Sequence, residues 1–119
     1  MRILAFNITH DSSVCSINNG HIEFFCKEER LSRVKRDKHP FKSLQLYKSK
    51  NFGKIDHILY CTPSNYNNQQ EYFYKEYIKK IFDMEMHNFS SLTHHLCHAS
   101  SAFYNSGFKK ALTFVIDRN

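Results

Sequence analysis

The sequence lacks an apolar run long enough to cross a membrane. The longest, residues 111–116, has six residues, whereas a membrane-spanning helix needs roughly 20. Residues 1–7 are too few for the apolar core of a signal peptide and lack a small-residue cleavage site. Only three glycines and two prolines are present, without low-complexity tracts, which argues against a disordered or collagen-like chain. We therefore expect a cytoplasmic protein without a membrane segment.

Paired cysteine spacing is also missing. The four cysteines contain no C-x-x-C pattern, which excludes a zinc ribbon, and nothing indicates the oxidising compartment that a disulfide framework requires. We interpret them as reduced, mostly buried thiols. With 119 residues, of which 41% are hydrophobic, the chain has enough apolar material for the core of one domain.

Positive charge is concentrated in one segment. The net charge is +6, yet residues 27–54 alone contain ten Lys and Arg against three acidic residues. A localised basic segment favours an anionic partner, either nucleic acid or a phosphorylated small molecule, although a solvated basic face explains the composition equally well. No aromatic residue interrupts residues 27–39. Because single-strand binders need such a stacking platform, nucleic acid is the least favoured partner.

Hydrophobic periodicity predicts an α/β fold. Strands are expected at residues 2–7, 13–17, 21–26, 55–61 and 111–116, with Asn19-Gly20 forming a type I′ turn between the second and third. Helices are expected after Pro40, over residues 68–84 and around residues 91–105. Residues 28–40 show no apolar periodicity and predict an extended basic loop. The order suggests a hairpin that joins a sheet covered by helices.

A histidine pair has the spacing of metal ligands. His94 and His98 are four residues apart on a predicted helix and project from one face, whereas His95 points roughly 100° away. Asp117, at the end of the last predicted strand, is a candidate third ligand. A helix with ordinary surface or core histidines explains the same spacing.

A polar turn follows the first predicted strand. His10 could act as a general base, because imidazole titrates near neutral pH. Asp11 could orient that imidazole or bind a cation, and the Ser12 hydroxyl and backbone amides could hold a phosphate or orient a nucleophile. An ordinary polar turn is the alternative.

A basic motif follows the predicted hairpin. The guanidinium groups of Arg30 and Arg33 can each donate paired hydrogen bonds, and the Lys35 ammonium adds a compact positive charge. Both kinds of group suit phosphate or adenylate oxygens. A solvated charged loop is the alternative.

These three motifs together resemble one family. They are similar, in this order, to the N-terminal part of the nodulation and antibiotic O-carbamoyltransferases: H-D-S-S (residues 10–13), E-E-R-x-S-R-x-K-x-D (residues 28–37) and H-H-x-x-H-A-x-S-A-F-Y-x-S-G-F (residues 94–108). The similarity covers nearly all 119 residues. Three ordered motifs at compatible spacing are far more specific than any one of them.

The resemblance implies both a fold and an activity. Residues 1–119 would be the N-terminal portion of an incomplete actin-like domain (sugar kinase/Hsp70-type, RNase H-like), with an N-terminal β-hairpin and a mixed sheet covered by helices. Family members also carry a C-terminal domain, absent here, that makes carbamoyl adenylate from carbamoyl phosphate and ATP. The actin-like domain then transfers the carbamoyl group to the hydroxyl of a small-molecule acceptor.

The resemblance also implies roles for particular residues. By position, His10 matches the catalytic histidine near the transferred group. Lys35 matches a lysine that contacts the activated intermediate, with Arg33 beside it. Iron is the expected ion, with zinc as an alternative, and its implied ligands are His94, His98 and Asp117.

Two departures from the family pattern shape our expectations. Arg118 follows Asp117 where the family usually has a glycine that lets the backbone approach phosphates. The rest of the actin-like domain and the adenylate-forming domain are missing, so we expect a fragment without a complete catalytic cycle, which a second chain could complete. The alternative is a non-catalytic module that binds an anionic ligand or a partner chain.

Overall fold

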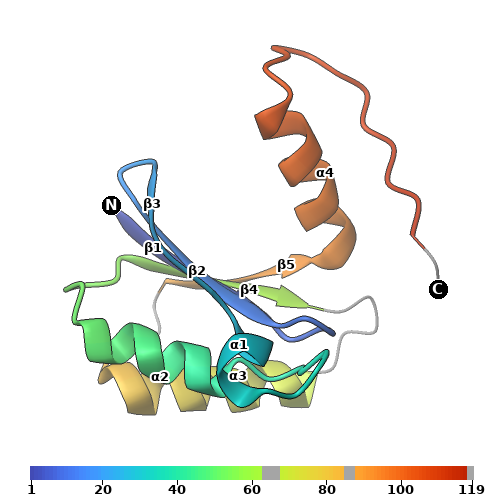
Figure 1. The fold of residues 1–119 in the computed structure, drawn as a ribbon. Helices are drawn as coiled ribbons and strands as arrows, with labels where there is room; N and C mark the ends of the chain where they lie inside the picture. The colour runs from blue at the N-terminus through green and yellow to red at the C-terminus, as the bar shows by residue number, and fades with distance from the viewer. Residues whose placement is uncertain (63–67, 85–87, 118–119) are drawn as a thin grey trace.

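A mixed five-stranded sheet organises the chain (Figure 1). The computed structural model describes residues 1–62, 68–84 and 88–117. Strand order is β3-β2-β1-β4-β5, with antiparallel pairing on one side of β1 and parallel pairing from β1 through β4 to β5. The strands are β1 (Arg2–Asn7), β2 (Ser13–Asn18), β3 (His21–Lys27), β4 (His57–Thr62) and β5 (Phe89–Thr93). The described residues therefore form the expected α/β arrangement with an N-terminal hairpin.

The turn between β2 and β3 confirms the sequence prediction. Asn19 and Gly20 both have positive φ, at 49° and 84°, as a type I′ turn requires. The Asn19 N–H also donates a hydrogen bond of 3.0 Å to the carbonyl of Met1. The turn is thereby attached to the start of β1, the central strand.

Four helices lie on the two faces of the sheet (Figure 1). On one face lie α1 (Glu28–Ser32), α2 (Phe41–Lys50) and α3 (Asn68–Phe82), whereas α4 (His94–Asn105) rises on the opposite side. Within the described residues, none of these helices has the length and apolar character needed to span a bilayer. One face of the sheet is therefore covered by α1, α2 and α3, whereas the other face is next to α4.

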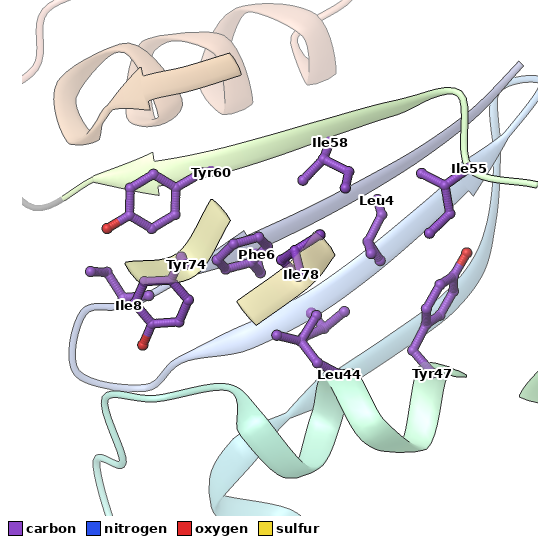
Figure 2. Close-up of a cluster of buried hydrophobic side chains, with 11 residues drawn as sticks. Leu4, Phe6, Ile8, Leu44, Tyr47, Ile55, Ile58, Tyr60, Tyr74 and Ile78 are labelled. Atoms are coloured by element: carbon purple, nitrogen blue, oxygen red, sulfur yellow. The ribbon is translucent and has the colours of Figure 1, made fainter. Parts of the chain in front are cut away.

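The hydrophobic core fills the space between the sheet and α2 and α3 (Figure 2). Alternate residues of a strand point to the same face, so Leu4 and Phe6 of β1 both face the helices and are at most 3% exposed. The ring centroids of Phe6 and Tyr60 are 5.3 Å apart. The other buried apolar side chains are Ile8, Val14, Leu44, Tyr47, Ile55, Ile58, Tyr74 and Ile78. Each large side chain buried here contributes about 1.5–3 kcal/mol to folding.

One buried carboxylate joins α1 to α2. Glu28 is 2% exposed, and its two oxygens accept the backbone N–H groups of Lys42 and Ser43 at 2.9 and 2.8 Å. These amides lie in the first turn of α2, where N–H groups have no helical acceptor and a negative charge is favoured. The Glu28 N–H donates to the carbonyl of Ser12 at 2.9 Å. Glu28 thus connects α1, α2 and the turn after β1.

The expected extended loop at residues 28–40 is wrong in its first part. Residues 28–32 form the single-turn helix α1. Glu28 and Glu29 occupy its first turn, where acidic side chains complement the helix dipole. The helix ends at Arg33, which adopts the left-handed conformation with φ of 61°. A helix this short has too few residues for apolar periodicity to reveal it.

The helix expected around residues 91–105 is present but begins at His94, where the Thr93 hydroxyl accepts the N–H of Leu96. Residues 89–93 form the unexpected strand β5, in parallel pairing with β4, and the strand expected at residues 111–116 is wrong. Residues 111–116 are not in a strand. Instead Leu112 and Phe114 are 81% and 79% exposed. Strand propensity is realised only where a neighbouring strand is available to pair.

We expect Glu28→Ala to lower the free energy of unfolding by about 2–3 kcal/mol, because two amides at the start of α2 lose their acceptor and a buried charged hydrogen bond is removed. Urea unfolding followed by circular dichroism measures the change. Glu76→Ala, at an exposed position of α3, is the control and should change the free energy by less than about 0.5 kcal/mol. Equal effects of the two substitutions would contradict the role of Glu28.

Candidate metal centre

The polar side of α4 faces the sheet. Side chains at positions 94, 97, 98 and 101 share one face of the helix because they are three or four residues apart. All four line a cavity of 480 Å³ between α4 and the sheet. On the other side of α4, Leu96 is 50% exposed. The cavity therefore has polar and ionisable side chains on its α4 side.

The opposite wall of the cavity comes from the sheet face that α2 and α3 leave open. Its apolar part is formed by Ala5 of β1, Leu59 of β4 and Leu92 of β5. Polar residues at the end of β1 and in the following turn form its rim: Asn7, Thr9, His10 and Ser13. Residues from the first and third sequence motifs thus line one cavity.

Three potential metal ligands converge beside this cavity. The Nε2 atoms of His94 and His98 are 3.0 Å apart, and His94 Nε2 is 2.6 Å from Asp117 Oδ2. One ligand atom from each residue lies within 4.8 Å of the others. His95 is not part of this group, as the helical spacing predicts. His94 is half-buried, and His98 and Asp117 are exposed.

The donor set fits a transition metal. Two imidazole nitrogens and one carboxylate oxygen suit zinc or iron(II), and three protein ligands leave positions for substrate oxygens. Ligand atoms bound at about 2.0–2.1 Å in tetrahedral geometry lie roughly 3.4 Å apart. In this group the His94–Asp117 and His94–His98 atoms are 2.6 and 3.0 Å apart, and all three lie within 4.8 Å of one another, so small side-chain movements would bring them to that spacing.

His10 projects from the turn that follows β1. Its side chain is 72% exposed, and its Nδ1 lies 3.0 Å from Asp11 Oδ2. Lys27 Nζ donates to the other oxygen of Asp11 at 3.2 Å. These hydrogen bonds from His10 and Lys27 lower the pKa of Asp11. The Asp11 carboxylate therefore orients the His10 ring and is itself held by Lys27.

Sequence reasoning missed Asn7, which organises this turn. Asn7 Oδ1 accepts both the N–H and the hydroxyl of Ser13 at 2.8 Å. Its Nδ2 donates to Thr9 Oγ1 at 3.0 Å, and that hydroxyl donates to the carbonyl of His10 at 3.2 Å. A strand-terminal asparagine that precedes a polar turn is a signal for such a network. Asn7 thus fixes the backbone that carries His10.

Ser12 lies in the interior. It is fully buried, and among the described residues its hydroxyl has no hydrogen-bond partner. Its N–H donates to the carbonyl of Asp37 at 2.9 Å. This bond attaches the turn that carries His10 to the end of the basic loop. A contact of Ser12 with a ligand stays a prediction.

The structure places Arg33 and Lys35 outside the cavity. Both are exposed, in the loop that ends at Asp37, and neither lines the cavity. The loop contains two left-handed residues, Arg33 and Arg36, with φ of 61° and 59°. Such conformations cost about 1–3 kcal/mol each and cluster at binding sites. The basic motif is therefore near the His10 turn in the fold but separate from the cavity.

Comparison with known proteins identifies no relative. The sequence matches no protein-family model, and no curated protein is significantly similar to it.

We expect Zn(II) and Fe(II) to bind the wild-type chain, and His94→Ala and His98→Ala to abolish this binding, because each removes one of three ligands. Calorimetric titration of the reduced protein measures the affinity. His95→Ala is the matched control on the same helix and should bind metal like the wild type. A loss in His95→Ala equal to that in the other variants would overturn the assignment.

Metal affinity should also fall as the pH is lowered, because protonated imidazole has no lone pair for a metal. The same titration repeated at several pH values tests the point. A pH-independent affinity would exclude histidine ligands.

Proposed function

We propose that this chain forms the acceptor and metal part of an O-carbamoyltransferase with an actin-like domain. The observation that carries the proposal is the cavity lined by His10, His94 and His98, which come from motifs far apart in the sequence. The order and spacing of the three motifs support the same family. The full reaction would use carbamoyl adenylate, formed from carbamoyl phosphate and ATP.

In this proposal His10 is the general base. The Asp11 carboxylate accepts the Nδ1–H of the imidazole, which leaves Nε2 with the lone pair that can take the proton of an acceptor hydroxyl. The lowered pKa of Asp11 keeps its carboxylate charged at neutral pH, and this charge stabilises the imidazolium that forms. Asn7 holds the turn in place, so the base is positioned before the substrate arrives.

His94, His98 and Asp117 would hold the metal ion. When bound, iron or zinc would supply a Lewis acid that polarises substrate oxygens. The apolar side chains of Ala5, Leu59 and Leu92 would form one wall of the acceptor site.

The basic loop would recognise the adenylate. In the described part of the chain, the side chains of Arg33, Lys35 and Arg36 are exposed and form no ion pair. Three such cations on one short loop favour a phosphate-bearing ligand. The same observation favours the second candidate, a non-catalytic module that binds an anion through this loop.

We expect Lys35→Ala to weaken the binding of a non-hydrolysable carbamoyl-adenylate analogue by about tenfold, the value of one charged hydrogen bond at about 1.4 kcal/mol. Calorimetry on the zinc-loaded chain measures this affinity. Lys48→Ala removes the same charge from an exposed position of α2 and should leave the affinity unchanged. Equal affinities of wild type, Lys35→Ala and Lys48→Ala would contradict the role of the loop.

His10→Ala should separate the two candidate functions. Because His10 is exposed, the substitution should change the free energy of unfolding by less than about 0.5 kcal/mol. When the chain is complemented with the adenylate-forming part of the proposed enzyme, the substitution should abolish acceptor-dependent release of AMP from supplied carbamoyl adenylate while the analogue still binds. His21→Ala, in the exposed hairpin, is the control and should release AMP like the wild type. Binding of the analogue without any AMP release by the complemented wild type would instead support the non-catalytic module.

A further inference from the structure

Two cysteines meet across the cavity, one from the sheet and one from α4. Tyr60 points into the core, so its neighbour Cys61 in β4 points to the opposite face. Cys97 lies on the polar side of α4, and both residues line the cavity. The Cys97 side chain is close enough to raise the pKa of the Cys61 thiol through a hydrogen bond, after the larger effect of burial. The two thiols therefore face each other across the cavity although they belong to different elements.

The surroundings of this pair differ from those of the other cysteines. Cys15 lines the same cavity from β2, on the far side of β1 from β4. Cys26 donates from Sγ to the backbone carbonyl of Lys27. Both residues are half-buried, like Cys61 and Cys97. The chain thus contains one facing cysteine pair and two cysteines that serve as internal controls.

We propose that Cys61 and Cys97 form a redox site, in which a hydroperoxide oxidises the two thiols to a disulfide that joins β4 to α4. A disulfide requires Cα atoms about 4.4–6.8 Å apart, which two side chains that face each other across one cavity would reach by movement of α4 against β4. Reversible disulfides of this kind occur in reducing compartments as sensors. Formation of the disulfide requires no side chain other than those of Cys61 and Cys97.

The reaction takes place in two balanced steps. In the first step the sulfur of Cys97 attacks the hydroperoxide, and its thiol proton goes to the departing oxygen. That attack breaks the O–O bond, gives a sulfenic acid at Cys97 and releases an alcohol or water. The sulfur of Cys61 then attacks the sulfur of Cys97 and displaces hydroxide, which leaves as water with the Cys61 proton. Two thiols are oxidised and one peroxide is reduced.

The disulfide would change the proposed metal centre. Cys97 precedes His98 and follows His94 by one turn, so a bond that moves this part of α4 towards β4 shifts both imidazoles. Displacing the supports of metal ligands typically costs 10–100-fold in affinity. This consequence depends on the proposed function, whereas formation of the disulfide does not.

Mass spectrometry of the full chain treated with hydrogen peroxide tests the proposal. The wild type should lose two hydrogen atoms, with a Cys61–Cys97 cross-link in the peptide map. Cys61→Ser and Cys97→Ser should not form this cross-link, and Cys15→Ser should form it like the wild type. Circular dichroism confirms that each variant is folded, and the wild-type map alone decides the pairing. Oxidation of the wild type to sulfinic acid, or a cross-link that includes Cys15 or Cys26, would overturn the proposal.

A zinc titration of reduced and peroxide-treated wild type tests the coupling. We expect the affinity to fall at least about tenfold after oxidation and to recover with dithiothreitol. Equal affinities before and after cross-linking would overturn the coupling. If the cross-link forms but the reduced protein binds no metal, the redox site stands and the proposed function fails.

Discussion

In the part of the chain that the structure describes, the core lies on one face of the sheet, and the candidate site depends on that asymmetry. Side chains alternate along β1, so Leu4 and Phe6 are buried against α2 and α3 while Ala5 and Asn7 face the other way. Because the apolar contacts on the first face stabilise the fold, the second face can line a cavity instead of forming a core. There α4 turns its histidines towards the sheet, and a cavity of 480 Å³ remains between them.

Much of the charge near the site stabilises the fold. Glu28 is buried at the start of α2, and Lys27 pairs with Asp11 and Glu29 at 3.2 and 3.4 Å. The exposed cations of the loop that follows are the ones available to an anionic ligand. Lys27 is therefore already paired with carboxylates, and an anionic ligand would meet the exposed cations of the loop instead. Substitutions that test the basic motif should therefore replace the exposed cations of the loop and leave Lys27 and Glu28 unchanged.

Local signals in the sequence predicted the parts of the fold that local interactions determine. Asn19-Gly20 specifies a turn by its backbone preferences alone, and the four-residue recurrence of apolar side chains specifies α3. The single-turn helix α1 was too short to be detected, whereas the errors near the C-terminus concern segments that depend on distant partners. Strand β5 contains Ser90 and Ser91 and forms because β4 supplies its hydrogen bonds, while residues 111–116 have strand propensity but no strand beside them.

In the candidate site, too, the features set by local geometry could be predicted from the sequence and those set by tertiary packing could not. The spacing of His94 and His98 predicts their convergence, because helix geometry fixes it. That Asp117 joins them, and that His10 lines the same cavity, depends on tertiary packing. Asn7 could have been noticed as a strand-terminal asparagine, but its three hydrogen bonds could not be deduced from the sequence.

The central claim is that the motifs around residues 10 and 94 share one cavity with a metal centre. Loading the chain with paramagnetic Co(II) and recording nuclear magnetic resonance spectra tests this most directly. The account predicts that Co(II) shifts or broadens the ring signals of His94, His98 and His10, together with the amide of Thr9, and leaves the ring signals of His21 and His39 unchanged. Perturbation of His94 and His98 without any effect on His10 would contradict it.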